Sequence, residues 1–239
     1  AFGQVAEPDT SLDLFERGGF AHYGNWPFWE HLSERYGDAI VRRTWNTARG
    51  STYSTRAVEK VLENRGGFAK RLAAFSAANP TPGRSYPEGD HWPAPKPEAT
   101  WTFGRRTTPR SDEVDVDHMA SASYVAVPDA TLTSEGFSGA PYRLRLTVDG
   151  PRAKSDPTAW LVVRTVDGEW RSEQVDLDRN GSTTVTTPFT IEKVEAVSLT
   201  LVNASTRFRC DKDTPDWSCF GIPRDQDQPF AVTAEVYQR

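Results

Sequence analysis

The chain has 239 residues, of which 37% are hydrophobic, and this is enough for one large domain or two ordinary ones. Its net charge of −5 comes from an acidic excess in residues 111–239, and no basic stripe is present, so the composition argues against nucleic-acid binding. No apolar run approaches the length of a membrane span, and we expect no transmembrane helix.

Residues 23–49 are rich in aromatic side chains and predict two helices joined by a glycine. Phe28, Leu32 and Tyr36 lie four residues apart and form one apolar stripe on the first helix. Gly37 can adopt the left-handed conformation that ends a helix. The second helix is expected to bury four side chains, Ile40, Val41, Thr44 and Trp45. Two short helices cannot readily enclose so many aromatic rings, so three tryptophans are candidate interface residues: Trp26, Trp29 and Trp45.

The order of residues in this stretch resembles a segment of bacterial secreted zinc metalloprotease-like proteins. The likeness is carried by YGNWPFW (23–29), LSERYG (32–37) and IVR (40–42) with Trp45, and it extends to residue 79 and, more weakly, into the C-terminal region. In that family a zinc-binding half with an HExxH motif precedes such a segment, and a β-rich region follows it. No HExxH occurs in these 239 residues. The resemblance therefore implies the non-catalytic C-terminal part of a secreted metalloprotease-like protein.

Two further helices are expected over residues 54–65 and 68–78, so residues 1–79 are predicted to form a small helical subdomain. Seven prolines then interrupt residues 80–110, which predicts an extended, polyproline-like connector. We expect the aromatic face of the subdomain to be covered by the upstream catalytic half, by another copy of the chain, or by this connector folded back.

From residue 111 to residue 239 the apolar spacing changes to every second residue, the pattern of strands with one buried face. The alternation is clearest over residues 142–148 and 230–236. Asp167-Gly168 and Asn180-Gly181 are strong signals for tight hairpin turns. Seven or eight antiparallel strands at this spacing predict a jelly-roll-like β-sandwich, and the whole chain is therefore expected to be of the α+β class.

The chain has two cysteines, Cys210 and Cys219, with eight residues between them. We expect a disulfide bond between them, because a loop of this length turns back readily at Pro215, and two free thiols are the alternative. The bond would require an oxidising, extracytoplasmic setting, so we expect a secreted protein whose first residue, Ala1, follows a processing or excision point. Trp217 lies inside this loop, either folded back on the sandwich or presented for recognition.

Metal ligands and catalytic motifs are scarce. The segment most similar to a zinc-binding helix contains His31 between Glu30 and Glu34. It has one histidine too few for a zinc site, so we expect no zinc cofactor. Ser138 does not lie in a G-x-S-x-G motif, and no other nucleophile motif is present. A hydrolase whose site residues are dispersed along the chain is the third hypothesis, after the two binding functions described below.

Asp176, Asp178 and Asn180 match the first positions of a calcium-binding loop. The bidentate carboxylate that such a loop needs at its twelfth position is missing, because Thr187 stands there. A tight turn is therefore the first interpretation and a calcium site the second. The acidic run over residues 111–117 is another oxygen-rich stretch, for which a solvated surface is the commoner outcome.

Two functions follow from these observations. The first is the non-catalytic portion of a metalloprotease-like protein, in which the sandwich binds a substrate, a surface or a partner protein. The second is a free-standing extracellular carbohydrate-binding or surface-assembly module, with Trp92, Trp101 and Trp217 as candidate ligand-binding residues. The expected partners are an upstream catalytic half or another copy of the chain, and a cell-surface glycan or protein.

Overall fold

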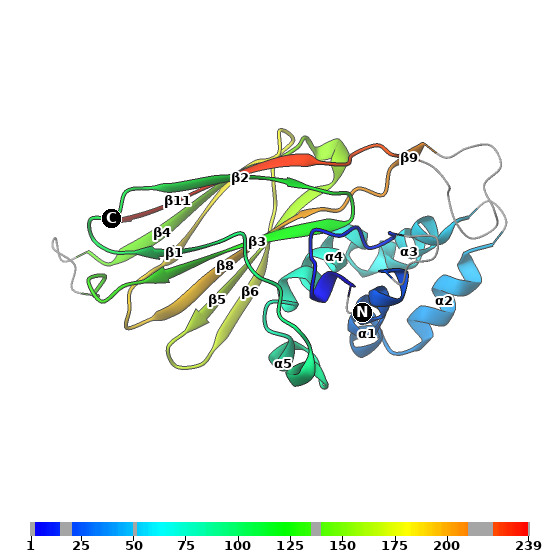
Figure 1. Ribbon diagram of the computed structural model, residues 1–239, viewed down its shortest axis with the longest axis horizontal. Coiled ribbons are helices and arrows are strands. Elements are labelled where there is room, and N and C mark those ends of the chain that lie inside the picture. The colour runs from blue at the N-terminus through cyan, green and yellow to red at the C-terminus, as the bar shows by residue number, and fades with distance from the viewer. Residues whose placement is uncertain (1–2, 15–20, 50–51, 135–139, 210–221, 239) are drawn as a thin grey trace.

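The computed structural model describes residues 3–14, 21–49, 52–134, 140–209 and 222–238. It shows the predicted α+β fold, with a group of short helices packed at one end of a β-sandwich (Figure 1). Within the described ranges, no helix has the length and apolar character needed to cross a membrane.

Four α-helices form the helical layer: α1 (Trp26–Tyr36), α2 (Ala39–Thr47), α3 (Ser54–Leu62) and α4 (Gly67–Ala78). They confirm the four predicted helices. The glycines between them have positive φ angles, 76° at Gly37 and 91° at Gly66, and this backbone conformation favours glycine over other residues. Three short 3₁₀ turns accompany them: η1 (Gly3–Val5), η2 (Ala21–Asn25) and η3 (Glu63–Arg65).

Helix α2 buries only part of the face that the sequence predicted. Ile40 and Thr44 are buried, whereas Val41 is 39% exposed and Trp45 is 67% exposed. The predicted inner position of Val41 and Trp45 is therefore wrong. Helix α2 packs on α1 and α3 along a narrow stripe, and its hydrophobic periodicity cannot tell how wide the contacted stripe will be.

Residues 80–110 form a folded segment in place of one extended connector. They contain the short helix α5 (Pro82–Ser85), the turn η4 (Gly89–His91) and strand β1 (Ala99–Phe103). Tyr86 is buried, and Trp92 stacks on its ring with centroids 4.6 Å apart. Trp92 also meets Trp26 edge-on at 4.9 Å. Of the three expected covers for the aromatic face, the folded-back connector is therefore the one that this chain supplies.

The sandwich has the strand order of a jelly roll. One sheet has the order β1-β3-β8-β5-β6 and the other has the order β2-β11-β4-β7. From β2 to β11 the chain passes from one sheet to the other at most connections, and β1 is added in parallel beside β3. The strand bounds are β2 (Arg110–Val116), β3 (Ala120–Pro128), β4 (Tyr142–Asp149), β5 (Pro157–Thr165), β6 (Trp170–Val175), β7 (Ser182–Pro188), β8 (Val194–Asn203) and β11 (Gln228–Gln238).

Two small elements lie at the helical end of the sandwich. Strands β9 (Phe208–Arg209) and β10 (Ile222–Pro223) pair as a short ribbon, and the 3₁₀ turn η5 (Ala153–Ser155) precedes β5.

The two predicted hairpin turns behave differently. Asp167-Gly168 joins β5 and β6, which pair as an antiparallel hairpin, so this prediction is confirmed. Asn180-Gly181 forms the expected tight turn, with φ of 91° at Gly181, but it joins β6 in one sheet to β7 in the other. The predicted hairpin at this turn is therefore wrong, because turn residues specify the local bend and not the sheet that the next strand joins.

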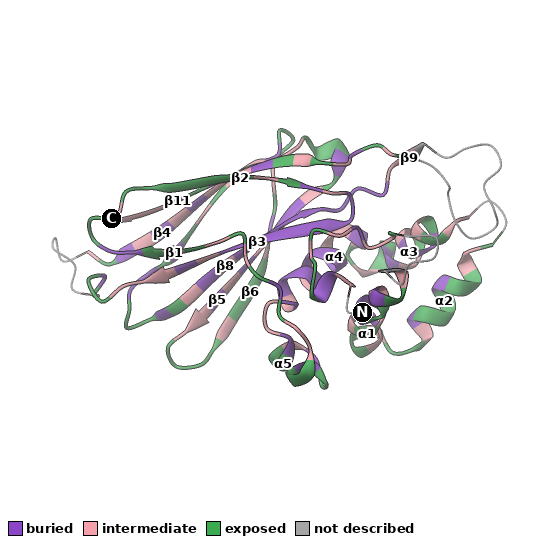
Figure 2. Ribbon diagram, viewed as in Figure 1, coloured by how far each residue is buried: buried purple, intermediate pink, exposed green. Residues whose placement is uncertain are grey.

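The molecule has two hydrophobic cores that share the sheet containing β8. The first lies between the two sheets and includes the buried rings of Phe103, Tyr124, Phe189 and Phe230. The second lies between the helices and the other face of that sheet, where Phe28, Leu32, Leu72 and Phe75 meet Met119, Val202 and Ala204. Residues 199–206 are consequently all buried, and their side chains lose the alternation of a strand with one solvent face. In Figure 2 the end of β3 that faces the helices is likewise buried.

Candidate functional site

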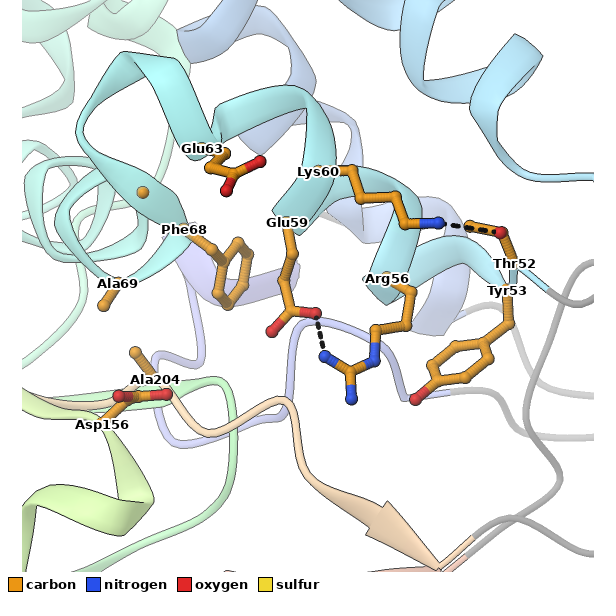
Figure 3. A pocket seen from close by; sticks show the side chains of 11 residues that line it. Thr52, Tyr53, Arg56, Glu59, Lys60, Glu63, Phe68, Ala69, Asp156 and Ala204 are labelled. Atoms are coloured by element: carbon orange, nitrogen blue, oxygen red, sulfur yellow. Dashed lines mark hydrogen bonds and ion pairs between the residues drawn. The ribbon is translucent and has the colours of Figure 1, made fainter.

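A cleft of about 670 Å³ lies between the helical layer and the neighbouring end of the sandwich. Figure 3 shows the side chains that surround it. Helix α3 and the residues beside it supply Thr52, Tyr53, Arg56, Glu59, Lys60 and Glu63; the first turn of α4 supplies Gly67, Phe68 and Ala69; and the sandwich supplies Asp156 and Ala204. The cleft therefore exists only because the helices pack against the sandwich.

The amphipathic character of α3 explains why charged groups face the cleft. Ala57, Val58 and Leu62 turn into the helical core and are buried. Arg56, Glu59, Lys60 and Glu63 recur at intervals of three and four residues, so they share the opposite face of the helix. The same periodicity that folds α3 thus produces a charged wall.

Most of the polar groups on this wall have partners. Arg56 Nη1 lies 3.0 Å from Glu59 Oε2, and Lys60 Nζ donates a hydrogen bond to Thr52 Oγ1 over 3.2 Å. The Thr206 hydroxyl donates to the other carboxylate oxygen of Glu59, which connects the sandwich to α3. These bonds hold the two sides of the cleft in a set geometry.

Asp156 is the charged group that the sandwich contributes. It has a left-handed backbone conformation, with φ of 45° and ψ of 47°, at the end of η5. Partial desolvation raises the pKa of its carboxyl, the charges of Glu59 and Asp225 raise it further, and Arg207 acts in the opposite direction. Among the described residues, the carboxylates of Asp156 and Glu63 accept no side-chain hydrogen bond, and both remain available to a ligand.

Asp225 is a buried carboxylate, and both of its oxygens accept hydrogen bonds. It is 4% exposed and accepts hydrogen bonds from Ser205 Oγ at 2.5 Å and from Arg207 Nη1 at 3.2 Å. Asn203 Nδ2 donates to its backbone carbonyl oxygen over 2.7 Å. Because its oxygens are occupied, Asp225 fixes the loop and adds negative potential without contacting a ligand.

The cleft thus carries three carboxylates, from Glu59, Glu63 and Asp156, against two cations, Arg56 and Lys60. Such a surface complements a ligand that carries a cationic group beside an anionic one.

A Ser–His–Asp contact occurs elsewhere, but its geometry is not that of a catalytic triad. His118 Nε2 lies 2.8 Å from Asp13 Oδ1, and its Nδ1 lies 2.6 Å from Gln226 Oε1 and 3.3 Å from Ser11 Oγ. Both ring nitrogens thus donate to oxygen acceptors, which leaves no lone pair to accept a proton from the serine. Ser11 and His118 are also each only 6% exposed, so a substrate cannot reach them.

These contacts give His118 a structural role and favour its protonated form. Burial alone would lower the pKa of its imidazole, but the hydrogen bond and charge of Asp13, with Gln226 and Asp117, outweigh burial and raise it. The ring attaches the N-terminal segment to the turn before β3 and to the turn before β11. No local pattern in the sequence indicates this cluster, since Asp13, His118 and Gln226 are more than a hundred residues apart from one another in the chain.

Two tryptophans that the sequence proposed for ligand binding lie outside the cleft. Trp92 stacks on Tyr86 over the helical layer. Trp101 lies on β1, stacks on Tyr124 with centroids 5.1 Å apart and packs against the sandwich core. Both rings are half-buried, and their described contacts are those of packing residues. Trp217, Cys210 and Cys219 lie outside the described residues, so the recognition role and the disulfide bond stay predictions.

The three candidate interface tryptophans differ in exposure. Trp26 is 39% exposed and Trp45 is 67% exposed, while Trp29 is half-buried and meets Phe28 edge-on with centroids 5.6 Å apart. None of the three lines the described cleft. Their role in an interface stays a prediction.

The candidate calcium loop forms a side-chain-stabilised turn. Asp178 Oδ1 accepts backbone N–H groups from Asn180 at 2.8 Å and from Ser182 at 3.0 Å. These backbone hydrogen bonds, that from Ser182 first, lower the pKa of the Asp178 carboxyl. In the described part of the chain, no group of three or more His, Cys, Asp or Glu residues could hold a metal ion. The described hydrogen bonds of Asp178 are those of the turn, the first of the two interpretations, and the calcium site stays a prediction.

No family model and no curated protein matches this chain. Among solved structures, it is similar to PliG of Aeromonas hydrophila, a periplasmic inhibitor of g-type lysozyme. The two are 12% identical, with 58% of this chain and 96% of that chain covered and a TM-score of 0.31. A Yersinia pseudotuberculosis-derived mitogen is 6% identical over 55% of this chain and 88% of its own, with a TM-score of 0.29. AlgX of Pseudomonas aeruginosa is 17% identical over 56% of this chain and 27% of its own, with a TM-score of 0.27. Scores at this level assign no function to the chain.

Proposed function

We propose that this chain is a non-catalytic binding module that holds a polypeptide segment in the cleft between α3 and the sandwich. The observation that carries the proposal is the presence of both charge signs in one cleft. Lys60 and Glu63 lie on the α3 side, and Asp156 lies on the sandwich side. The carboxylates of Glu63 and Asp156 accept no hydrogen bond from the described residues. A segment with neighbouring basic and acidic side chains would satisfy both signs.

Carbohydrate binding is supported less well at this cleft. Sugars are commonly held against exposed aromatic faces, but Phe68 is only 8% exposed and Tyr53 is half-buried at the edge. Trp92 and Trp101, the described candidates for sugar stacking, lie elsewhere and serve in packing. The charged character of the walls favours a polypeptide over a neutral glycan.

The resemblance in residues 23–49 supplies the wider setting of the proposal. In that setting the module belongs to a secreted metalloprotease-like protein and presents a substrate or partner to an upstream catalytic half. A free-standing surface-assembly module is the alternative. Sequencing the encoding gene upstream of Ala1 separates them, since an HExxH motif there supports the first and its absence supports the second.

The binding proposal is tested with fluorescently labelled peptides of equal length. One alternates lysine and glutamate, and the others carry only lysine, only glutamate or only neutral side chains. We expect the mixed peptide to bind most tightly, with an affinity that decreases as salt increases.

Asp156→Asn is the most informative variant, because asparagine keeps the shape of the side chain and tolerates the left-handed backbone found there. It should weaken binding of the mixed peptide by about tenfold, as expected for the loss of a charged contact. Asp38→Asn, which changes an exposed carboxylate at the start of α2, is the matched control and should bind normally. Equal binding of all four peptides, or an unchanged affinity of the Asp156 variant, would refute this use of the cleft.

A further inference from the structure

Arg71 on α4 is a buried cation with no described counter-charge. The residue is 4% exposed, and its Nε is buried without a hydrogen-bond partner. None of the ion pairs between described residues includes it. A guanidinium has five N–H donors and stays charged, so its burial without an acceptor is electrostatically unfavourable.

The guanidinium lies against the beginning of its own helix. A Cβ placed on Gly66, the residue that caps α4, would lie 2.9 Å from Arg71 Nη2 and 3.7 Å from its Cζ. Gly66 itself is exposed, and no side chain caps the first N–H groups of this 12-residue helix. The start of a helix is its positive end, so the arrangement places a cation beside a second source of positive potential.

Two further basic residues lie near this point, Lys70 and Arg35. The aliphatic Cδ of Lys70 would lie 3.1 Å from the same added Cβ at Gly66. Desolvation lowers the pKa of the Arg71 guanidinium, and Arg35 on α1 lowers it further, against an opposite effect of Tyr36. The Tyr36 hydroxyl donates a hydrogen bond to the carbonyl oxygen of Arg65 over 3.2 Å.

The nearby His31 is affected by the same positive charges, those of Arg35 and Arg71. Its Nε2 is buried without a hydrogen-bond partner. Burial, followed by the charges of Arg35 and Arg71, lowers the pKa of its imidazole to about 4. The imidazole is therefore neutral at physiological pH and supplies no further charge.

We infer that the start of α4 is a binding site for a small oxoanion, held by the Arg71 guanidinium and the first backbone N–H groups of the helix. A carboxylate, phosphate or sulfate presents paired oxygens that match the planar fork of a guanidinium. Helix N-termini bind such groups through their unpaired N–H donors and their dipole. The exposed Gly66 leaves the site open to solvent. The first turn of α4 also lines the peptide cleft, so the two sites adjoin. The anion site depends on Arg71, which is not among the described residues that line the cleft, and it does not depend on the proposed role of the cleft.

Thermal unfolding of the full chain tests the site. Inorganic phosphate, sulfate and acetate are each compared with chloride at the same ionic strength. We expect Tm to rise with the concentration of at least one of the three anions beyond the chloride control, since a ligand that binds only the folded state stabilises it. The comparison of acetate with phosphate and sulfate distinguishes a carboxylate site from a site for tetrahedral anions.

Arg71→Met separates anion binding from a structural role. Methionine fills similar space without charge, so the variant should have the same Tm as the wild type in chloride, or a higher one, and should bind the anion at least about tenfold more weakly. Arg42→Met removes an exposed arginine from α2 and should respond to the anions as the wild type does. Equal anion responses of Arg71→Met and the wild type, or no response of the wild type to any of the three anions, would overturn the inference.

A second measurement covers the case in which Arg71→Met does not fold. The pKa of His31 is followed by NMR in the unmodified chain, with and without the anion that gives the largest rise in Tm. A bound anion should offset the charges of Arg35 and Arg71 and raise this pKa from about 4. An unchanged His31 titration at saturating anion would contradict binding at the start of α4.

Discussion

The His118 cluster permits the sharpest test of the fold, through the substitution Asp13→Asn. Asp13 accepts the Nε2–H of His118 over 2.8 Å, and the two side chains are 24% and 8% exposed. Breaking a fully buried charged pair costs about 3–5 kcal/mol, and partial exposure of Asp13 reduces this to about 2 kcal/mol. For a chain of this size, that loss lowers Tm by roughly 4–8 °C.

The loss should depend on pH in a defined direction. Because the folded state raises the pKa of His118 above its unfolded value near 6.5, the stabilisation is fully present below that value. It disappears as pH rises through the folded pKa, where the imidazole becomes neutral. Thermal unfolding at pH 6 and pH 9 should therefore show a large effect of Asp13→Asn at the lower pH and a small one at the higher pH.

Other titrating groups near His118 define the controls. The pKa of Asp117 is raised, first by desolvation and then by its hydrogen bond to Asp227 and the charge of that residue. Because the wild type and the Asp13→Asn variant both retain Asp117, the difference between them at each pH reports mainly on the contact of Asp13 with His118. Asp38→Asn, which changes an exposed carboxylate, should behave as the wild type at both values. An Asp13→Asn loss of equal size at pH 6 and pH 9 would refute the assignment of His118 as a cation.

Three other outcomes are expected. Trp29→Ala should lower the free energy of unfolding measured in urea by about 2–3 kcal/mol. This is less than for a fully buried ring, because Trp29 is half-buried against Phe28. Unchanged stability would place the ring outside the core. Asp178→Ala should lower Tm more at pH 7 than at pH 3, since the lowered pKa of Asp178 makes its stabilisation present above the unfolded pKa and lost in acid; an equal effect at both pH values would contradict this. Non-reducing mass spectrometry should show Cys210 bonded to Cys219 within one chain, and two free thiols would disprove the bond.

The helices show how much short-range pattern can determine. Phe28 and Leu32 lie four residues apart, and both are buried as their spacing predicts. Gly37 and Gly66 end helical segments with the positive φ that glycine favours. The strand alternation and the Asp167-Gly168 turn were equally readable, because each signal arises from residues within one turn or one strand.

Long-range pairing decided the features that the sequence left open. Strand β1 adds in parallel to β3 from within the proline-rich segment, and the Asn180-Gly181 turn leads from one sheet to the other. No local preference distinguishes these outcomes, since a strand can satisfy its hydrogen bonds in either sheet and the choice depends on which faces become buried together.

The two candidate sites likewise combine a local sequence pattern with the packing of distant elements. The sequence alone determined that α3 carries Arg56, Glu59 and Lys60 on one face, because that follows from helical periodicity. Only the tertiary structure brought Asp156 and Ala204 to that face, from positions about 100 and about 145 residues further along the chain. Only the tertiary structure buried Arg71 at the start of α4 without a described counter-charge. Periodicity specifies which side of a helix is polar. What the polar side faces depends on the packing of distant elements, which is decided by the total apolar surface that the folded chain removes from water.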